Sequence, residues 1–202
     1  MSRKACITGT ANITLGGKTV ICADVHLRGD LYRLSSTSSS GQNPTAISIG
    51  RCTVISTGTI VKPPSRVSRG VYNYYPLKIG DNVFIGKLFE TVPPLKGSTN
   101  QHNPGPNSVI QSTSISSHVH VGQNCVLQPF SIIKENCRVL PNSVVPAFMV
   151  IPAGSVVGGQ PARILGEVGE GWGISPGAAA GGGGTGDWVE GGDLRELVRS
   201  IR

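Results

Sequence analysis

Apolar residues recur at every sixth position through the second half of the chain. Nine consecutive hexads between residues 109 and 162 each begin with Val, Leu or Ile, at Val109, Ile115, Val121, Leu127, Ile133, Val139, Val145, Ile151 and Val157. The fifth position of a hexad is usually small, as at Cys125, Ser131 and Cys137. Because it lies two residues before the next first position, both side chains point to one side of a strand. Each hexad therefore predicts one short strand with two inward side chains, followed by a bend.

This period excludes an amphipathic helix and is typical of an all-β fold, the parallel β-helix. Three such strands close one triangular coil, so residues 18 positions apart are expected to stack. The period recurs less regularly earlier in the chain, with first positions predicted at Ile7, Ile13, Thr19, Val25, Leu31, Ile49, Ile55, Val61, Ile79 and Ile85. The sequence therefore predicts one β-helix over residues 5–165.

Three insertions are expected to interrupt the β-helix, at residues 35–45, 63–76 and 87–107. Joining residue 86 directly to residue 106 restores a hexad, IGPNSV, so the third insertion is predicted to loop out. Residues 166–192 are rich in glycine and are predicted to form a disordered linker. Residues 193–202 predict a short amphipathic helix, with Asp193 as its N-cap and Leu194, Leu197, Val198 and Ile201 on one face. A helix this short must dock on another surface or stay disordered, and packing back across the C-terminal side of the solenoid is one arrangement that its apolar face allows.

Composition narrows the classes of partner and compartment. The 202 residues carry a net charge of +7, but the basic side chains are scattered and the aromatic content is 5%, which disfavours nucleic-acid binding. No apolar run is long enough to span a bilayer, and no secretory leader is expected. The five cysteines include no CxxC pair, and Cys125 and Cys137 are predicted to be buried thiols, which favours a reducing compartment such as the cytosol.

Several longer motifs, taken in order, resemble one family. They are residues 9–18 (GTANITLGGK), 25–31 (VHLRGDL), 62–64 (KPP), 69–71 (RGV), 75–81 (YPLKIGD), 79–86 (IGDNVFIG) and 118–125 (HVHVGQNC). Together they resemble the dynactin subunit 5 family, within the γ-carbonic-anhydrase-like hexapeptide proteins. The resemblance covers most of residues 6–165. The Ser-rich and Pro-rich insertions and the Gly-rich tail depart from the family.

The resemblance implies a left-handed β-helix that acts as a non-catalytic scaffold subunit of the dynactin pointed-end complex. Its implied partners are dynactin subunit 6, the pointed-end actin-related protein, dynactin subunit 4 and cargo adaptors. The implied setting is dynein-driven transport along microtubules in the cytoplasm, including transport of endosomes. No cofactor is implied. Arg28 and Asp30 match a structural Arg-Gly-Asp pair of the wider family, which predicts an ion pair between coils or subunits.

Two enzyme classes are the alternatives. A γ-class carbonic anhydrase needs three histidines around zinc, but the matching positions hold Lys62, then Lys87 or Pro106, then Gln111 or Val92. A lysine ammonium repels the metal, so no metal ligand or catalytic residue is predicted. In a hexapeptide acyltransferase a histidine acts as the general base, and His118 is the candidate here. His118 and His120 are otherwise expected to be surface imidazoles.

Outward positions predict protein contacts. Strands centred on Leu127 and Val145 should expose Val126, Val144 and Pro146, and those centred on Ile133 and Ile151 should expose Ile132, Val150 and Pro152. The third face should present His120 and Arg138 instead. Stacked apolar side chains on two faces of a small prism favour a binding surface over simple strand propensity.

Overall fold

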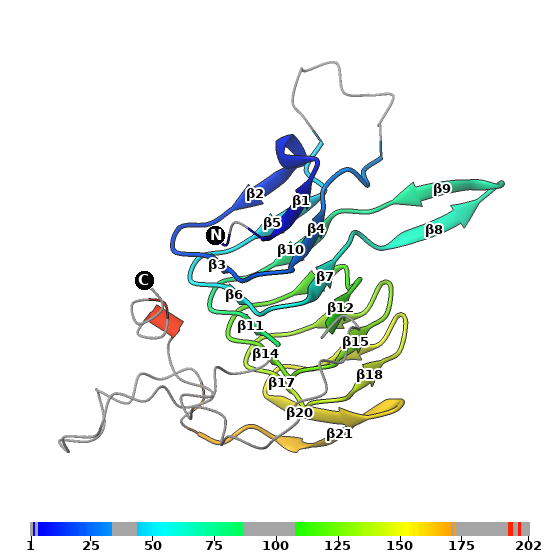
Figure 1. Ribbon diagram of the computed structural model, residues 1–202. Helices are drawn as coiled ribbons and strands as arrows, with labels where there is room; N and C mark the ends of the chain where they lie inside the picture. The colour runs from blue at the N-terminus through cyan, green and yellow to red at the C-terminus, as the bar shows by residue number, and fades with distance from the viewer. Residues whose placement is uncertain are drawn as a thin grey trace, which may run out of the picture.

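The computed structural model describes residues 2, 4–33, 44–86, 108–170, 172, 194, 195 and 198. Short parallel strands stack into three sheets that form the sides of a prism (Figure 1). Face A contains β1 (Cys6–Thr8), β4 (His26–Arg28), β7 (Thr59–Val61), β12 (Ser108–Ile110), β15 (Val126–Leu127) and β18 (Val144–Val145). Face B contains β2 (Ile13–Leu15), β5 (Ile47–Ile49), β10 (Leu77–Ile79), β13 (Ser114–Ile115), β16 (Ile132–Ile133) and β19 (Val150–Ile151).

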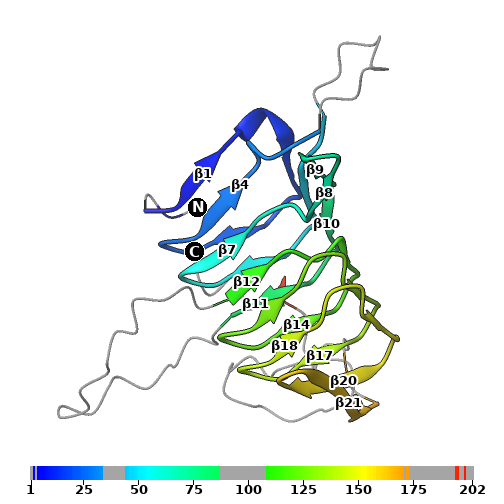
Figure 2. The ribbon, with the colours of Figure 1, turned by 90° about the vertical axis from the view of Figure 1, so that its right-hand side faces the viewer.

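Face C contains β3 (Val20–Ile21), β6 (Val54–Ile55), β11 (Phe84–Ile85), β14 (His120–Val121), β17 (Arg138–Val139), β20 (Ser155–Gly159) and β21 (Ala162–Glu167). The chain runs from face A to face B to face C in each coil, and Figure 2 shows the strands of face A lying one below another. The predicted parallel β-helix is therefore confirmed.

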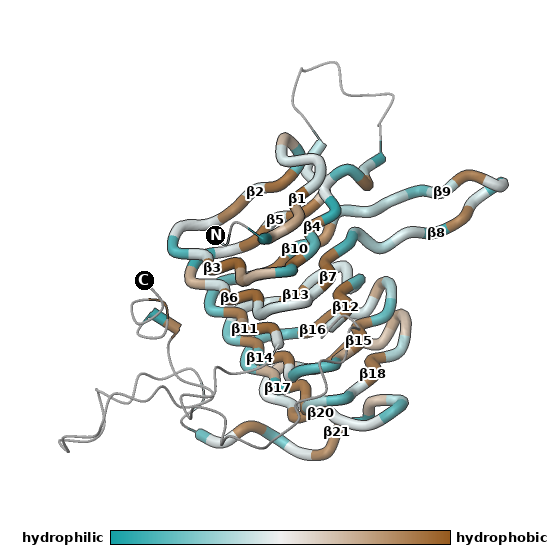
Figure 3. Tube along the Cα trace, in the orientation of Figure 1, coloured by the Kyte–Doolittle hydropathy of each residue, from teal (hydrophilic) through white to brown (hydrophobic). Residues whose placement is uncertain are grey.

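Inward aliphatic side chains form three columns inside the prism. Val121 lies beside Val139 and Leu127 beside Val145, so the predicted 18-residue stacking holds in the second half of the chain. These side chains are at most 1% exposed. The cross-coil pairing satisfies the backbone groups while the columns bury the apolar surface, which is how a solenoid is stabilised. In Figure 3 the apolar colour is concentrated in the strands, and the corners are mostly polar.

The corners of the coils have a regular backbone conformation. A residue with positive φ occurs at every sixth position from 118 to 154, namely His118, Asn124, Phe130, Asn136, Asn142, Phe148 and Gly154. Each is the fourth residue of its hexad, so the bend of the repeat is a left-handed residue. Asn tolerates this conformation, whereas a bulky side chain such as Phe adopts it rarely. The two phenylalanines are therefore conspicuous.

The register at the start of the regular repeat differs from the prediction. Val109 is half-buried on the outside of β12, and Ile110 is the inward residue that lies beside Leu127. The next inward residue, Ile115, follows after five positions, so this corner is one residue short. The prediction failed because Val109 and Ile110 are both aliphatic. The restored hexad IGPNSV, which ends at Val109, is consistent with Ile110 as the next inward residue.

The N-terminal register is also corrected. The inward positions that stack on later coils are Ile7, Leu15, Ile21 and Leu27. The short 3-10 helix η1 (Thr10–Asn12) lengthens the first corner by two residues. Ile13, Thr19 and Val25 consequently occupy fifth positions, and Leu31 lies outside the strands.

The second predicted insertion is a β-hairpin. Strands β8 (Ser65–Ser68) and β9 (Val71–Tyr74) pair antiparallel with each other and project from the body (Figure 1). Most of the first predicted insertion, all of the third and most of the predicted linker lie outside the described residues. Within the part of the chain that is described, no helix is both long and apolar enough to cross a membrane.

The C-terminal end of the solenoid is covered differently from the prediction. Strand β21 pairs antiparallel with β20 and extends face C by one strand. Leu194, Arg195 and Val198 have helical conformation, and they are the only described residues of the predicted helix. Leu194 and Val198 are buried against Cys52, Val54 and Phe84, on the outer side of face C. The suggested packing of this segment across the end of the solenoid was therefore wrong.

Candidate partner-binding surfaces

Two of the positions weighed as zinc ligands are described, and both directly follow strands of face A. Lys62 follows β7 and donates its backbone N–H to Ile110 O at 3.0 Å, and Gln111 follows β12 in the next coil. Positions 87, 92 and 106 lie outside the described residues. Among the residues that are described, no group of three or more His, Cys, Asp or Glu side chains is placed to hold a metal ion.

The three described histidines differ in their surroundings. His26 is exposed on face A, and His118 forms a corner between faces B and C. His120, predicted to be at the surface, is only 3% exposed. Its ring contacts that of Trp172 with centroids 4.8 Å apart, and that of Phe84 with centroids 5.9 Å apart.

The environment of His120 favours the neutral imidazole. Burial, followed by the positive charges of Arg138 and His118, lowers the pKa of His120 to about 4. Trp172 Nε1 also donates to His118 O at 3.0 Å, which fixes Trp172 over this part of face C. The outer side of face C is therefore buried within the chain at the level of β14, because residues from the C-terminal part of the chain cover it.

Face A carries a column of apolar side chains on its outer side. Ile60, Val109, Val126 and Val144 lie in register on successive coils, and all four are half-buried. Val126 and Val144 were predicted to lie here. Pro146, predicted with them, is also half-buried.

Face B is apolar only in its last two coils. Ile132 lies beside Val150, and Val150 is 54% exposed. Pro152 is exposed just after β19. The corresponding outward positions in earlier coils are Ser114, Lys78, Ser48 and Thr14, which are polar. The predicted apolar face is therefore a local patch.

Aromatic side chains join these two apolar areas at the corner between faces A and B. Phe130 and Phe148 stack with centroids 5.2 Å apart and planes 9° apart, and Phe148 is 67% exposed. The rings of Tyr75 and Phe130 pack in a T-shaped arrangement with centroids 5.3 Å apart. The coil between Tyr75 and Phe130 has the shortened corner from Ile110 to Ile115.

Sequence reasoning missed this corner because it followed only inward and outward strand positions. The available signal was two phenylalanines 18 residues apart at the bend position of the repeat. Two bulky residues held in the left-handed region cost stability, and such strain is often retained at functional positions. We name the combined surface the corner patch, and it consists of Val126, Phe130, Ile132, Val144, Phe148 and Val150.

Arg28 and Asp30 form a bidentate ion pair. Arg28 Nε and Nη2 each donate to the carboxylate at 2.8 Å, and Thr8 Oγ1 donates to Asp30 Oδ1 at 2.5 Å. Hydrogen bonding from Arg28 holds the pKa of Asp30 well below its usual range. The pair was predicted to join coils or subunits. Within the chain its two charges belong to one turn rather than to two coils, and the Thr8 hydroxyl makes the link to the preceding coil. A contact of the pair with another subunit stays a prediction.

Comparison with known proteins gives relatives in sequence and in fold. No family model matches the chain. Over 87 residues the chain is 34% identical to dynactin subunit 5 of Dictyostelium discoideum, and the match covers 43% of this chain and 37% of that protein. The chain therefore spans well under half the length of this curated relative.

Three solved structures share the fold at low identity. PerB from Caulobacter crescentus, solved with CoA and GDP-perosamine, is 16% identical with a TM-score of 0.50, covering 82% of this chain and 56% of PerB. WeeI from Acinetobacter baumannii is 18% identical with a TM-score of 0.52, covering 82% and 57%. AntD, an N-acyltransferase from Bacillus cereus solved with dTDP and coenzyme A, is 17% identical with a TM-score of 0.50, covering 84% and 81%. The chain thus has the left-handed parallel β-helix fold of hexapeptide-repeat proteins.

Proposed function

We propose that this chain is a non-catalytic scaffold subunit of a dynactin-type pointed-end complex. Its sequence similarity to dynactin subunit 5 supports this assignment. In such a complex it lies beside dynactin subunit 6, the pointed-end actin-related protein and dynactin subunit 4. There it helps dynein–dynactin to engage cargo adaptors during microtubule-based transport in the cytoplasm.

The corner patch is the structural feature that best supports a scaffold function. Phe148 and Val150 are 67% and 54% exposed. On the neighbouring strands Val144 lies beside Val126 and Ile132 lies beside Val150, so no charged residue separates the members of these pairs. Aromatic residues at the centre of an apolar patch are typical of binding hot spots. The stacked coils hold these side chains in fixed positions, so little conformational entropy is lost when a partner binds.

The test is co-purification of the tagged full-length chain with its complex. Ile132→Lys with Val150→Lys places two charges on the corner patch. Ser48→Lys with Ser114→Lys is the matched control, because both serines point outward from the polar part of the same face. We expect the first pair to reduce recovery of dynactin components at least about tenfold and the control pair to leave it unchanged, with both retaining wild-type circular dichroism.

Three outcomes contradict the proposal. One is a wild-type chain that recovers no dynactin component by mass spectrometry. Another is acetyl-CoA binding in calorimetry that is lost in His118→Ala, which assigns an acyltransferase instead. The third is one zinc per chain in elemental analysis, removable by a chelator with loss of the fold.

A further inference from the structure

The β8–β9 hairpin is a preformed arm outside the solenoid. It leaves the coil between β7 and β10, and its strands belong to a separate two-stranded sheet. Its tip is a two-residue turn in which Arg69 and Gly70 have φ of 51° and 76°. Two successive positive φ values indicate the tight hairpin turn whose twist matches that of the flanking strands. The tip therefore holds Arg69 in a defined place.

The arm exposes apolar side chains that no other described part of the chain covers. Val67 and Tyr72 lie directly opposite each other, so their side chains share one side of the hairpin. They are 53% and 65% exposed, and Val71 on the other side is 62% exposed. A two-stranded hairpin is only marginally stable in water by itself. Such exposure on an isolated arm favours a partner that packs against it.

The charge of the arm defines the chemistry of that partner. Arg66 and Arg69 are both exposed, and no Asp or Glu occurs between residues 61 and 80. A second copy of this chain, with a net charge of +7, would bring more positive charge to the same place. An acidic protein surface is complementary instead. The exposed aliphatic Val67 and Val71 favour a protein over a nucleic acid, whose phosphates would call for more basic residues than the two arginines of the arm.

We propose that the β8–β9 hairpin is a docking arm for an acidic protein partner, one that presents an apolar groove flanked by Asp and Glu side chains. The proposal rests on the scaffold function proposed above, and it adds a second contact site. The corner patch lies in later coils, and its contact with Tyr75 through Phe130 falls at the base of the hairpin, just after β9. The two sites can therefore be varied independently.

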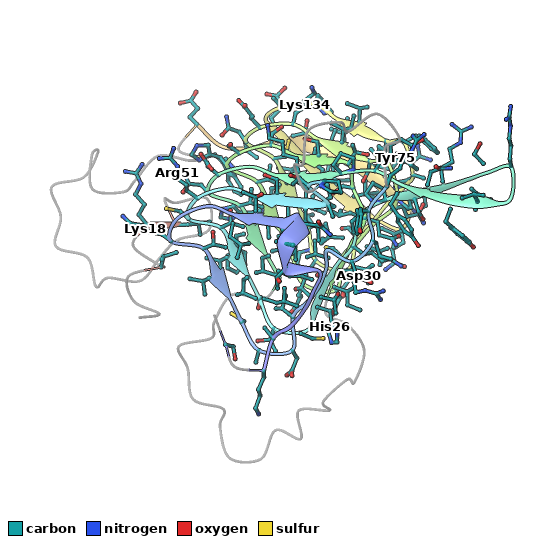
Figure 4. All side chains as sticks on the ribbon, turned by 90° about the horizontal axis from the view of Figure 1, so that it is seen from above. Lys18, His26, Asp30, Arg51, Tyr75 and Lys134 are labelled. Carbon is teal, nitrogen blue, oxygen red and sulfur yellow. The ribbon has the colours of Figure 1, made fainter. Side chains whose placement is uncertain are left out.

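The experiment compares full-length variants within the assembled complex. Arg66→Glu with Arg69→Glu reverses the charge of the arm, and Val67→Ser with Tyr72→Ser removes its apolar side. Lys18→Glu with Arg51→Glu is the control, because it makes the same change of charge at two exposed cations on the opposite side of the molecule (Figure 4). We expect each arm variant to lower the fraction of chain in the complex at least about tenfold, with an unchanged Tm. The control should assemble like the wild type.

A photocrosslinking residue at position 72 identifies the occupant. The expected product joins the arm to a segment of another subunit that is rich in Asp and Glu, and its yield should fall as salt rises. Crosslinks to nucleic acid or to a second copy of this chain overturn the docking arm. So does normal assembly of both arm variants, while the scaffold function stands. A wild-type chain that stays monomeric in cell extract overturns the scaffold function itself, and the docking arm with it.

Discussion

Acid should weaken the fold through one side chain, His120. Burial, together with the nearby positive charges of Arg138 and His118, lowers its pKa from 6.5 in the unfolded chain to about 4 in the folded chain. Between these two values the unfolded chain binds more protons, so the free energy of unfolding falls as the pH falls through this interval. Below pH 4 the contribution is constant. A separation of about 2.5 pH units corresponds to about 3 kcal/mol.

The assay is urea unfolding at pH values from 7.5 to 3.5, monitored by tryptophan fluorescence. The chain has two tryptophans, so Trp188→Phe leaves Trp172 as the only reporter, beside the His120 ring. His120→Phe preserves an aromatic side chain against Phe84 and Trp172 but cannot bind a proton. Other titrating groups are common to both proteins. The wild type should therefore lose about 3 kcal/mol more than His120→Phe between pH 7 and pH 4.

The control is His26→Phe, because His26 is exposed on face A. It should follow the wild type across the whole range. Equal acid sensitivity of the wild type and His120→Phe would refute the reasoning, since the proton would then enter elsewhere. A Trp172 signal that changes at acid pH while the far-ultraviolet circular dichroism does not would locate the change at the covering segment.

Three further predictions concern the core, the thiols and the ion pair. Val145→Asp places a carboxylate inside the prism and should cost about 4 kcal/mol or abolish folding, whereas the outward Val144→Asp should cost about 1 kcal/mol in the same urea titration. Native Cys6 is exposed and should react with a disulfide reagent roughly a hundredfold faster than Cys125, whose pKa is raised by burial; equal rates would contradict the inward placement. Asp30→Asn should lower stability at pH 7 by less than about 1 kcal/mol, because the pair is exposed. This difference should shrink as the pH falls from the ordinary Asp range towards the lowered pKa of folded Asp30, because a depressed carboxyl pKa contributes stability that is lost only as the folded group becomes protonated.

The sequence predicted the fold wherever a local rule decides the structure. The alternation that buries Val121 and Val139 follows from strand geometry, and it repeats because each coil must pair with the next. The rule failed at Val109 and Ile110, where either aliphatic residue can face inward and only the stacking on Leu127 decides. It failed again at Ile13, because the extra turn of η1 has no strong sequence signal.

The surroundings of the candidate sites were less accessible to sequence reasoning. The burial of His120 depends on Trp172, which lies 52 residues later and outside any repeat. Nothing in the spacing of either residue indicates that contact. The stacking of Phe130 on Phe148 was available from the 18-residue period, but it required attention to the bends as well as the strands. The hairpin required recognition of Arg69-Gly70 as a tight turn between two strands.

The covering of face C changes how the solenoid should melt. In a stack of coils each layer touches only its neighbours, so a solenoid tends to unravel from an end, one layer at a time. Here Leu194 and Val198 pack on side chains from β3, β6 and β11, and Trp172 reaches the next layer at β14. The described residues Trp172, Leu194 and Val198 therefore contact four successive layers of face C. A layer cannot detach without breaking these contacts, so the unfolding of one layer is coupled to that of the other three. We therefore expect these layers to unfold in a single concerted event.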